Sequence, residues 1–167
     1  MPRRSFCGVR VVFRKTKRGL CLWEAYPPKR RPVSAVGGTA GHALPHDLTQ
    51  FLVERELGHR YGFWGCLADG ATFRSLEWGG RRRTPQGRAL IVAHVEDLDR
   101  AEDDANAHDR AWREGRPTPL APVFEEMRSR WLALPEGGEI ELDFPLSPPS
   151  SPDRRRRRVA ASRQHSN

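Results

Sequence analysis

Cysteine is scarce in this chain of 167 residues, which contains only Cys7, Cys21 and Cys66. No two of them stand in a C-x-x-C pair, and their number is odd. Small secreted domains that depend on disulfides carry an even set of cysteines. The scarcity therefore argues against a disulfide framework and favours reduced thiols in a cytoplasm.

Long hydrophobic runs are also missing. No apolar stretch approaches the roughly 18 residues that a helix needs to cross a bilayer. Arg3 and Arg4 are not followed by a hydrophobic segment long enough for export. The glycine-rich stretch 37–41 lacks the Lys-Ser/Thr pair of a P-loop, and no internal repeat is apparent. We therefore expect a cytoplasmic protein with no membrane partner and no nucleotide site at this stretch.

Apolar residues make up 37% of the chain and charged residues 30%, so the core is small or part of the chain stays unfolded. Residues 145–167 consist mainly of proline, serine and arginine and offer nothing to bury. This composition predicts a disordered basic tail over 145–167. The remaining residues, 1–144, have the length of one domain.

The net charge of +8 is unevenly distributed. Residues 145–167 contain six arginines and one aspartate, which leaves +3 for the rest of the chain. Residues 1–33 contain ten lysines and arginines against one acid, whereas residues 96–114 contain eight acids against three arginines. The domain is therefore bipolar, with an acidic helix that can offset the basic end in cis.

Three segments have the alternating pattern of strands. Residues 8–14 and 20–26 predict a hairpin, and residues 139–144 alternate acidic and apolar side chains as a half-buried strand does. Residues 27–41 are mostly loop, with one short edge strand at 33–36. The hairpin is the natural partner of the C-terminal strand, because its basic side chains complement the acids Glu139, Glu141 and Asp143.

Four helices are expected. One covers 44–57 between Pro45 and Gly58, and a short one covers 63–69. The first has apolar residues on two sides, which predicts a central position. Another helix begins near 119–122 and ends before Pro135, with an apolar side that consists of Phe124, Met127, Trp131 and Leu134.

The fourth predicted helix is long and covers 86–114, with Thr84 as its N-cap. Its weakest point is 103–106, because aspartate and asparagine favour turns. If it projects from the body, its apolar stripe is a surface for a protein partner; the alternative is that the stripe packs on the protein's own core. The stripe consists of Ile91, Val95, Leu98, Ala105 and Trp112.

A polar group on the helix 44–57 is the main candidate for chemistry. It consists of His46, Asp47, Gln50 and Glu54. A histidine and a carboxylate one turn apart can bind a metal, but Gln50 occupies the position that H-E-x-x-H requires for its second histidine. The alternatives are a metal-dependent hydrolase that uses His46, Asp47 and Glu54, and a structural network around this helix.

Two weaker catalytic hypotheses remain. The His46-Asp47 pair is similar to the doublet of the HD phosphohydrolases, whose metal site needs further ligands from other helices. The candidates for those ligands are His94 with Asp97 and His108 with Asp109. Cys66 could act as a nucleophile with His59 or His46 as its base, or it could simply fill the core.

Clusters of basic residues suggest nucleic-acid binding, because arginine and lysine release counterions from phosphates. The alternative is that these residues only keep the protein soluble. The candidates are Arg14, Lys15, Lys17, Arg18, Arg81, Arg82, Arg83, Arg154, Arg155, Arg156, Arg157 and Arg158.

The stretch from Leu44 to Gly58, followed by Gly62-Phe-Trp-Gly65, carries a resemblance. It resembles small uncharacterised bacterial proteins with an L-P-H-D-L-x-H-F-x-V-E core and a G-F-W/F-G segment after it. The resemblance implies no function. Gln50 stands where those proteins often have histidine, so a ligand pair with His46 is in doubt here.

Together these features predict an α+β domain with a small antiparallel sheet, formed by the N-terminal hairpin and the C-terminal strand, against three or four helices. The expected function is non-catalytic binding of an acidic partner, nucleic acid or an acidic protein, without cofactor or metal. The alternatives are the metal-dependent hydrolase and a protein–protein adaptor that uses the long helix 86–114.

Overall fold

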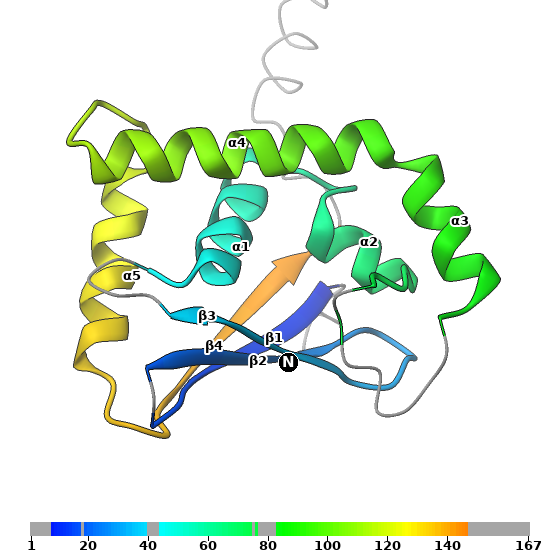
Figure 1. Ribbon diagram of the computed structural model, residues 1–167, viewed down its shortest axis with the longest axis horizontal. Coiled ribbons are helices and arrows are strands. Elements are labelled where there is room, and N and C mark those ends of the chain that lie inside the picture. The colour runs from blue at the N-terminus through cyan, green and yellow to red at the C-terminus, as the bar shows by residue number, and fades with distance from the viewer. Residues whose placement is uncertain (1–7, 18, 40–43, 75, 77–82, 147–167) are drawn as a thin grey trace, which may run out of the picture.

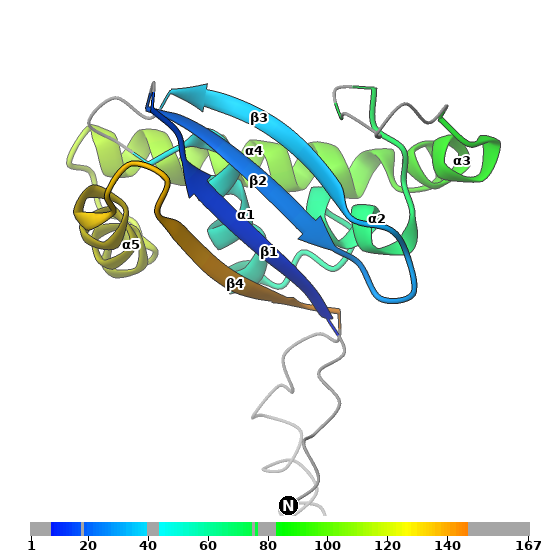
Figure 2. The same ribbon diagram turned by 90° about the horizontal axis from the view of Figure 1, so that it is seen from below.

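The computed structural model describes residues 8–17, 19–39, 44–74, 76 and 83–146. Their strands form one antiparallel sheet in the order β3-β2-β1-β4. The predicted α+β class is confirmed: the described helices all lie on one face of this sheet (Figures 1 and 2). The strands are β1 (Gly8–Lys15), β2 (Leu20–Tyr26), β3 (Val33–Thr39) and β4 (Glu139–Pro145).

The predicted hairpin and its C-terminal partner are confirmed. Val11 pairs with Leu142 and Phe13 pairs with Ile140 across β1 and β4, so the apolar side chains of both strands face the helices. The edge strand β3 is longer than expected, because the pairing with β2 resumes at Thr39, opposite Leu20, after a register shift that follows the Val36–Leu22 pair. The predicted tail begins at the end of β4, and residues 147–167 lie outside the described residues.

The helices form two layers above the sheet. Figure 1 shows α1 and α2 between the sheet and α4, which crosses over them, while α5 stands at one side. The described helices are α1 (His46–Leu57), α2 (Phe63–Asp69), α3 (Pro85–Ala93), α4 (Val95–Arg113) and α5 (Ala121–Ala133). None of the helices in the described parts of the chain is both long and apolar enough to span a membrane.

Helix α1 has the predicted central position. Every residue from Leu48 to Glu54 is buried, because the sheet covers one side of the helix and α4 the other. Pro45 is the N-cap, and Gly58 ends the helix with the left-handed backbone (φ 73°) that glycine adopts without a Cβ clash. Phe51 joins the sheet below through edge-to-face contacts with Phe13 and Phe144.

The prediction of one long helix over 86–114 is wrong, because the chain turns at His94. The His94 ring stacks on Tyr61 at 4.1 Å between centroids, and its backbone leaves the helical region at φ −119° and ψ 23°. The suspected break at 103–106 does not occur. Ala101 and Ala105 are buried where α4 packs on α1, and this tertiary packing overrides the weak helix propensity of the aspartates.

The turn at His94 also divides the predicted stripe. Ala105 is buried and Trp112 packs on the core, whereas Val95 is 49% exposed. The predicted N-cap is present, since the Thr84 hydroxyl accepts a hydrogen bond from the Gly87 N–H at 2.9 Å. Helix α5 buries three of its four predicted apolar residues, Phe124, Met127 and Trp131, while Leu134 is half-buried.

Candidate functional site

Glu54 is the most constrained polar residue of the predicted constellation. Its carboxylate is fully buried and accepts the backbone N–H groups of Phe63 and Trp64 at 2.9 and 3.0 Å. The Gln50 side chain donates a third hydrogen bond at 3.0 Å. Glu54 thus closes the N-terminus of α2, where helix N–H groups otherwise lack acceptors. Burial raises the pKa of Glu54 to about 7, although the three donors lower it.

Two glycines of the segment 62–65 are required by this arrangement. A methyl group at Gly62 would lie 2.5 Å from the carboxyl carbon of Glu54, and one at Gly65 would overlap the carbonyl oxygen of Arg60. The G-F-W-G segment and Glu54 are therefore one structural unit. They join the end of α1 to the start of α2 through a buried carboxylate.

Asp47 has a different partner. Its Oδ2 accepts the indole N–H of Trp23 at 3.0 Å, which connects α1 to the middle of β2. A methyl group at Gly37 would lie 2.5 Å from the same oxygen, so the closely approaching strand β3 has no side chain there. The carboxylate therefore holds the helix on the sheet.

His46 lies at the edge of the core. Its side chain is half exposed, with Nδ1 3.8 Å from Asp47 Oδ1 and Nε2 3.5 Å from Glu102 Oε1 on α4. The neighbouring Asp47 carboxylate raises the pKa of His46, and the charge of Glu102 adds to the effect. His46 thus links the start of α1 to α4.

The constellation is therefore divided among three structural contacts. Within the described residues, no three His, Cys, Asp or Glu side chains come together in a group that could hold a metal. His94 stacks on Tyr61, and His108 Nδ1 lies 2.7 Å from Thr118 Oγ1. This separation gives the hydrolase hypotheses no assembled site.

Cys66 is placed as a core residue. Its thiol is buried and lies 3.2 Å from the backbone oxygen of Tyr61, and burial raises the pKa of Cys66 to about 12. A reactive nucleophile needs a thiolate near neutral pH. His59, the candidate base, has its Nε2 2.8 Å from Asp104 Oδ2 instead.

Two basic candidates of the hairpin are already engaged. Arg14 forms an ion pair with Glu139 across the sheet, and its Nε donates to the same carboxylate at 2.7 Å. The Lys15 ammonium donates to the backbone oxygens of Trp131 and Leu134 at 3.3 and 3.2 Å, where α5 ends. Lys17 is exposed in the turn, and no described residue pairs with it.

The remaining basic candidates are distributed differently. Arg18, Arg81, Arg82 and the run 154–158 lie outside the described residues. Arg83 is described, and its Nε donates to the backbone oxygen of Thr72 at 2.7 Å. This contact places Arg83 beside the chain that leaves α2.

Other cations lie near Arg83 and the end of α2. Arg30, from the loop between β2 and β3, packs its guanidinium on Gly70 at the end of α2, where Figure 2 shows the loop beside the helix. Arg88 donates to the backbone oxygen of Arg83 at 3.3 Å. We call the following set the basic end: Lys29, Arg30, Arg31, Arg74, Arg83 and Arg88.

The basic end differs from the hairpin in its lack of counter-charges. Within the described part of the chain, no carboxylate lies within 4.0 Å of a nitrogen of any of its six side chains. Five of the six residues are exposed, and Arg83 is half-buried. The surface therefore presents about six positive charges that no described carboxylate neutralises at contact distance.

Sequence reasoning selected only Arg83 of this set. The run Lys29-Arg30-Arg31 between prolines was a visible signal, although its position in the fold was not. Arg74 and Arg88 are isolated in the sequence, and only the folding of their segments around α2 brings them to this end of the molecule.

Comparisons with known proteins add no further constraint. No family model matches the chain, and no curated protein or solved structure matches it either.

Proposed function

We propose that the protein binds nucleic acid without catalysis and that the basic end is its main contact surface. The observation that carries this proposal is the set of six cations from three separate segments, none of which pairs with a described carboxylate. Unpaired cations contribute their full charge to a polyanion, whereas paired ones must first lose their partner.

The physics of such a surface favours binding by charge. Each cation that meets a phosphate releases a condensed counterion, and this gain does not depend on the base sequence. Arginine, which supplies five of the six positions, also presents a planar fork that matches phosphate oxygens. Backbone contacts hold Arg83 and Arg88, so less side-chain entropy is lost when they bind.

The alternatives receive less support. A hydrolase that uses His46, Asp47 and Glu54 would need ligands that share one ion, yet Glu54 already accepts three hydrogen bonds in the core. An adaptor that uses the helical stripe would need Val95 and Trp112 on one exposed surface, and Trp112 packs on the core.

Salt-dependent binding tests the proposal. We expect the full chain to bind labelled generic DNA and RNA, with an affinity that falls steeply between about 50 and 200 mM salt. The variant Lys29→Gln/Arg31→Gln/Arg74→Gln removes three exposed cations whose side chains form no hydrogen bond with the residues that the structure describes. Its slope of log affinity against log salt should be smaller by up to about 3.

The matched control is Arg100→Gln/Arg110→Gln/Arg130→Gln, which removes the same charge from exposed positions on α4 and α5. The control should keep the slope of the native chain. Fluorescence anisotropy with single- and double-stranded probes measures both variants. Absence of salt-sensitive binding in the native chain, or an equal loss in the control, would reject the proposal.

A further inference from the structure

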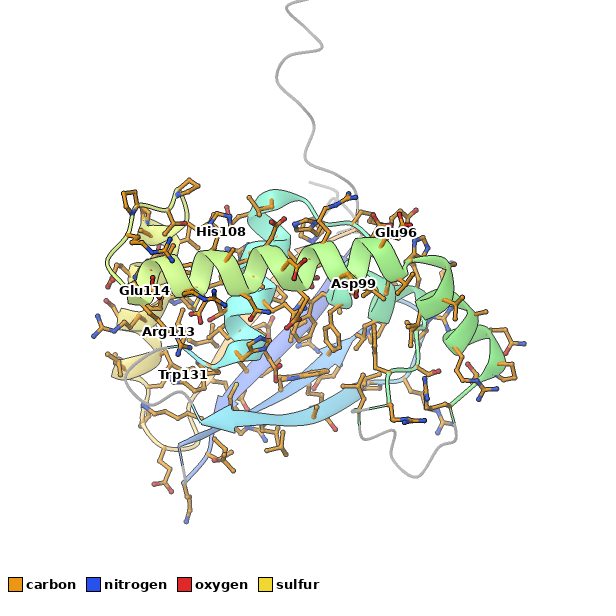
Figure 3. The ribbon with its side chains drawn as sticks, turned by 45° about the horizontal axis from the view of Figure 1, so that its top comes forward. Glu96, Asp99, His108, Arg113, Glu114 and Trp131 are labelled. Atoms are coloured by element: carbon orange, nitrogen blue, oxygen red, sulfur yellow. The ribbon has the colours of Figure 1, made fainter. Side chains whose placement is uncertain are left out.

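The first half of α4 has an outward face that no other described element covers. At about 100° per residue, Val95, Glu96, Asp99 and Asp103 fall within an arc of about 100°. All four are exposed, and Val92, three residues before Val95, is 75% exposed. Figure 3 shows that Glu96 and Asp99 belong to this half of α4, and that Arg113 and Glu114 belong to the other end. We call Val95, Glu96, Asp99 and Asp103 the α4 face; Val92 belongs to the last turn of α3.

The acids of the α4 face differ from the other acids of the helix. Asp97, Asp104 and Asp109 each lie within ion-pair distance of a histidine or an arginine. The side chains of Glu96, Asp99 and Asp103 form neither an ion pair nor a hydrogen bond with any residue in the described ranges. Like charges one turn apart destabilise a helix, so this face favours a cationic cover.

We propose that the C-terminal segment of the same chain, residues 147–167, docks on the α4 face. This inference does not depend on nucleic-acid binding by the basic end. The segment has six arginines and one aspartate, and five of the arginines are consecutive, at 154–158. Val159 follows the run directly and supplies an apolar side chain for the exposed Val95.

Charge complementarity selects this face over the rest of the described surface. Other exposed acids for which no partner is found in the described ranges are Glu126, Glu136 and Asp143, which belong to α5, to the turn after it and to β4. They are divided among three elements, whereas the three carboxylates of the α4 face follow one helix at i, i+3 and i+7. A row of this kind matches a continuous run of arginines.

The chain is long enough for this contact. The segment begins after Leu146, which packs on the core at the end of β4. Its 21 residues can extend over about 70 Å, and α4 is only about 28 Å long. Docking within one molecule also benefits from the high effective concentration that a short tether provides.

Limited proteolysis of the full chain tests the docking. Trypsin cleaves after arginine, so the initial rate of cleavage at 154–158, measured by mass spectrometry without nucleic acid, reports how far this run is covered. The variant Glu96→Gln/Asp99→Asn/Asp103→Asn should be cleaved about tenfold faster than the native chain at low salt, the factor expected for three surface ion pairs. About 0.5 M salt should remove the difference.

The matched control is Glu126→Gln/Glu136→Gln/Asp143→Asn, which changes the net charge equally and should be cleaved at the native rate. Circular dichroism verifies that both variants keep their helices. Equal rates for the native chain and the α4 variant would overturn the proposal, as would an equal acceleration in the control. Protection that increases with protein concentration would also overturn it, because the segment would then dock on a second copy.

Discussion

The polar residues of α1 and the cations of the basic end differ in both sequence spacing and role. His46, Asp47, Gln50 and Glu54 stand close together in one helix, yet they contact three different elements of the fold. The basic end draws its cations from residues 29–88, yet they form one surface. Closeness in the sequence is therefore a poor guide to a shared site.

The two groups differ in role because the polar side chains of α1 have partners within the protein, whereas the cations of the basic end have no described carboxylate as a partner. A buried charge is tolerated only with hydrogen bonds or a counter-charge, so Glu54 is committed to the backbone of α2. An exposed cation needs no partner, because water solvates it, and it remains available to a ligand. Substitutions of the polar residues in α1 should therefore alter stability without altering nucleic-acid binding. Substitutions in the basic end should weaken nucleic-acid binding without altering stability.

The largest effect is expected for Glu54→Ala. The substitution leaves the buried N–H groups of Phe63 and Trp64 without an acceptor and should lower the free energy of unfolding by roughly 3 kcal/mol. Urea denaturation followed by tryptophan fluorescence measures the loss. Nucleic-acid affinity should stay unchanged under conditions in which the variant is folded.

Glu56→Ala is the control for this change, since Glu56 belongs to the same helix but is exposed and pairs with its neighbour Arg55. It should change the free energy of unfolding by less than about 1 kcal/mol. Similar losses for the two variants would contradict the role of Glu54 as the acceptor for α2.

The second effect is a pH dependence of stability. Burial raises the pKa of Glu54 from 4.5 to about 7, so the folded chain holds this proton more tightly than the unfolded chain. The resulting stabilisation is complete below pH 4.5 and is lost as the pH rises through about 7. The raised pKa of His46 acts in the same direction, with a contribution that is complete below pH 6.5.

Denaturation curves at several pH values between about 4.5 and 8 measure this dependence. Glu54→Gln should remove most of the decline with rising pH, which is on the order of 3 kcal/mol, and His46→Gln should remove a smaller part. A native chain that gains stability across this range would show that the hydrogen bonds from Phe63, Trp64 and Gln50 outweigh the burial of the carboxylate.

Much of the fold could be predicted from the sequence because its signals are local. Pro45 and Gly58 bound α1, the alternation in 139–144 predicts β4, and both are confirmed. The turn at His94 could not be predicted, because it depends on a ring contact with Tyr61, a residue distant in the sequence. The continuity of α4 also depends on tertiary packing, because Ala105 is buried at the point where helix propensity alone suggested a break.

The candidate sites were harder to predict, because the role of a polar side chain depends on the residues that it contacts in the fold. Nothing in the spacing of Asp47 and Glu54 shows that one bonds to Trp23 and the other to the backbone of α2. Only the fold brings Arg74 and Arg88 to the basic end. The hairpin was visible as a basic segment, and its charge complementarity with the C-terminal strand was predicted, so Arg14 could have been assigned to the sheet from the start.

The smallest effect is expected for Arg14→Gln, which tests whether a paired cation behaves differently from the basic end. Arg14 already has Glu139 as its partner, so its loss should cost little stability and leave the salt dependence of nucleic-acid binding unchanged. Arg31→Gln, a single change in the basic end, should lower the slope of log affinity against log salt by about 1. If Arg14→Gln lowers the slope as much, the ion pair with Glu139 does not withhold the cation, and the hairpin belongs to the binding surface after all.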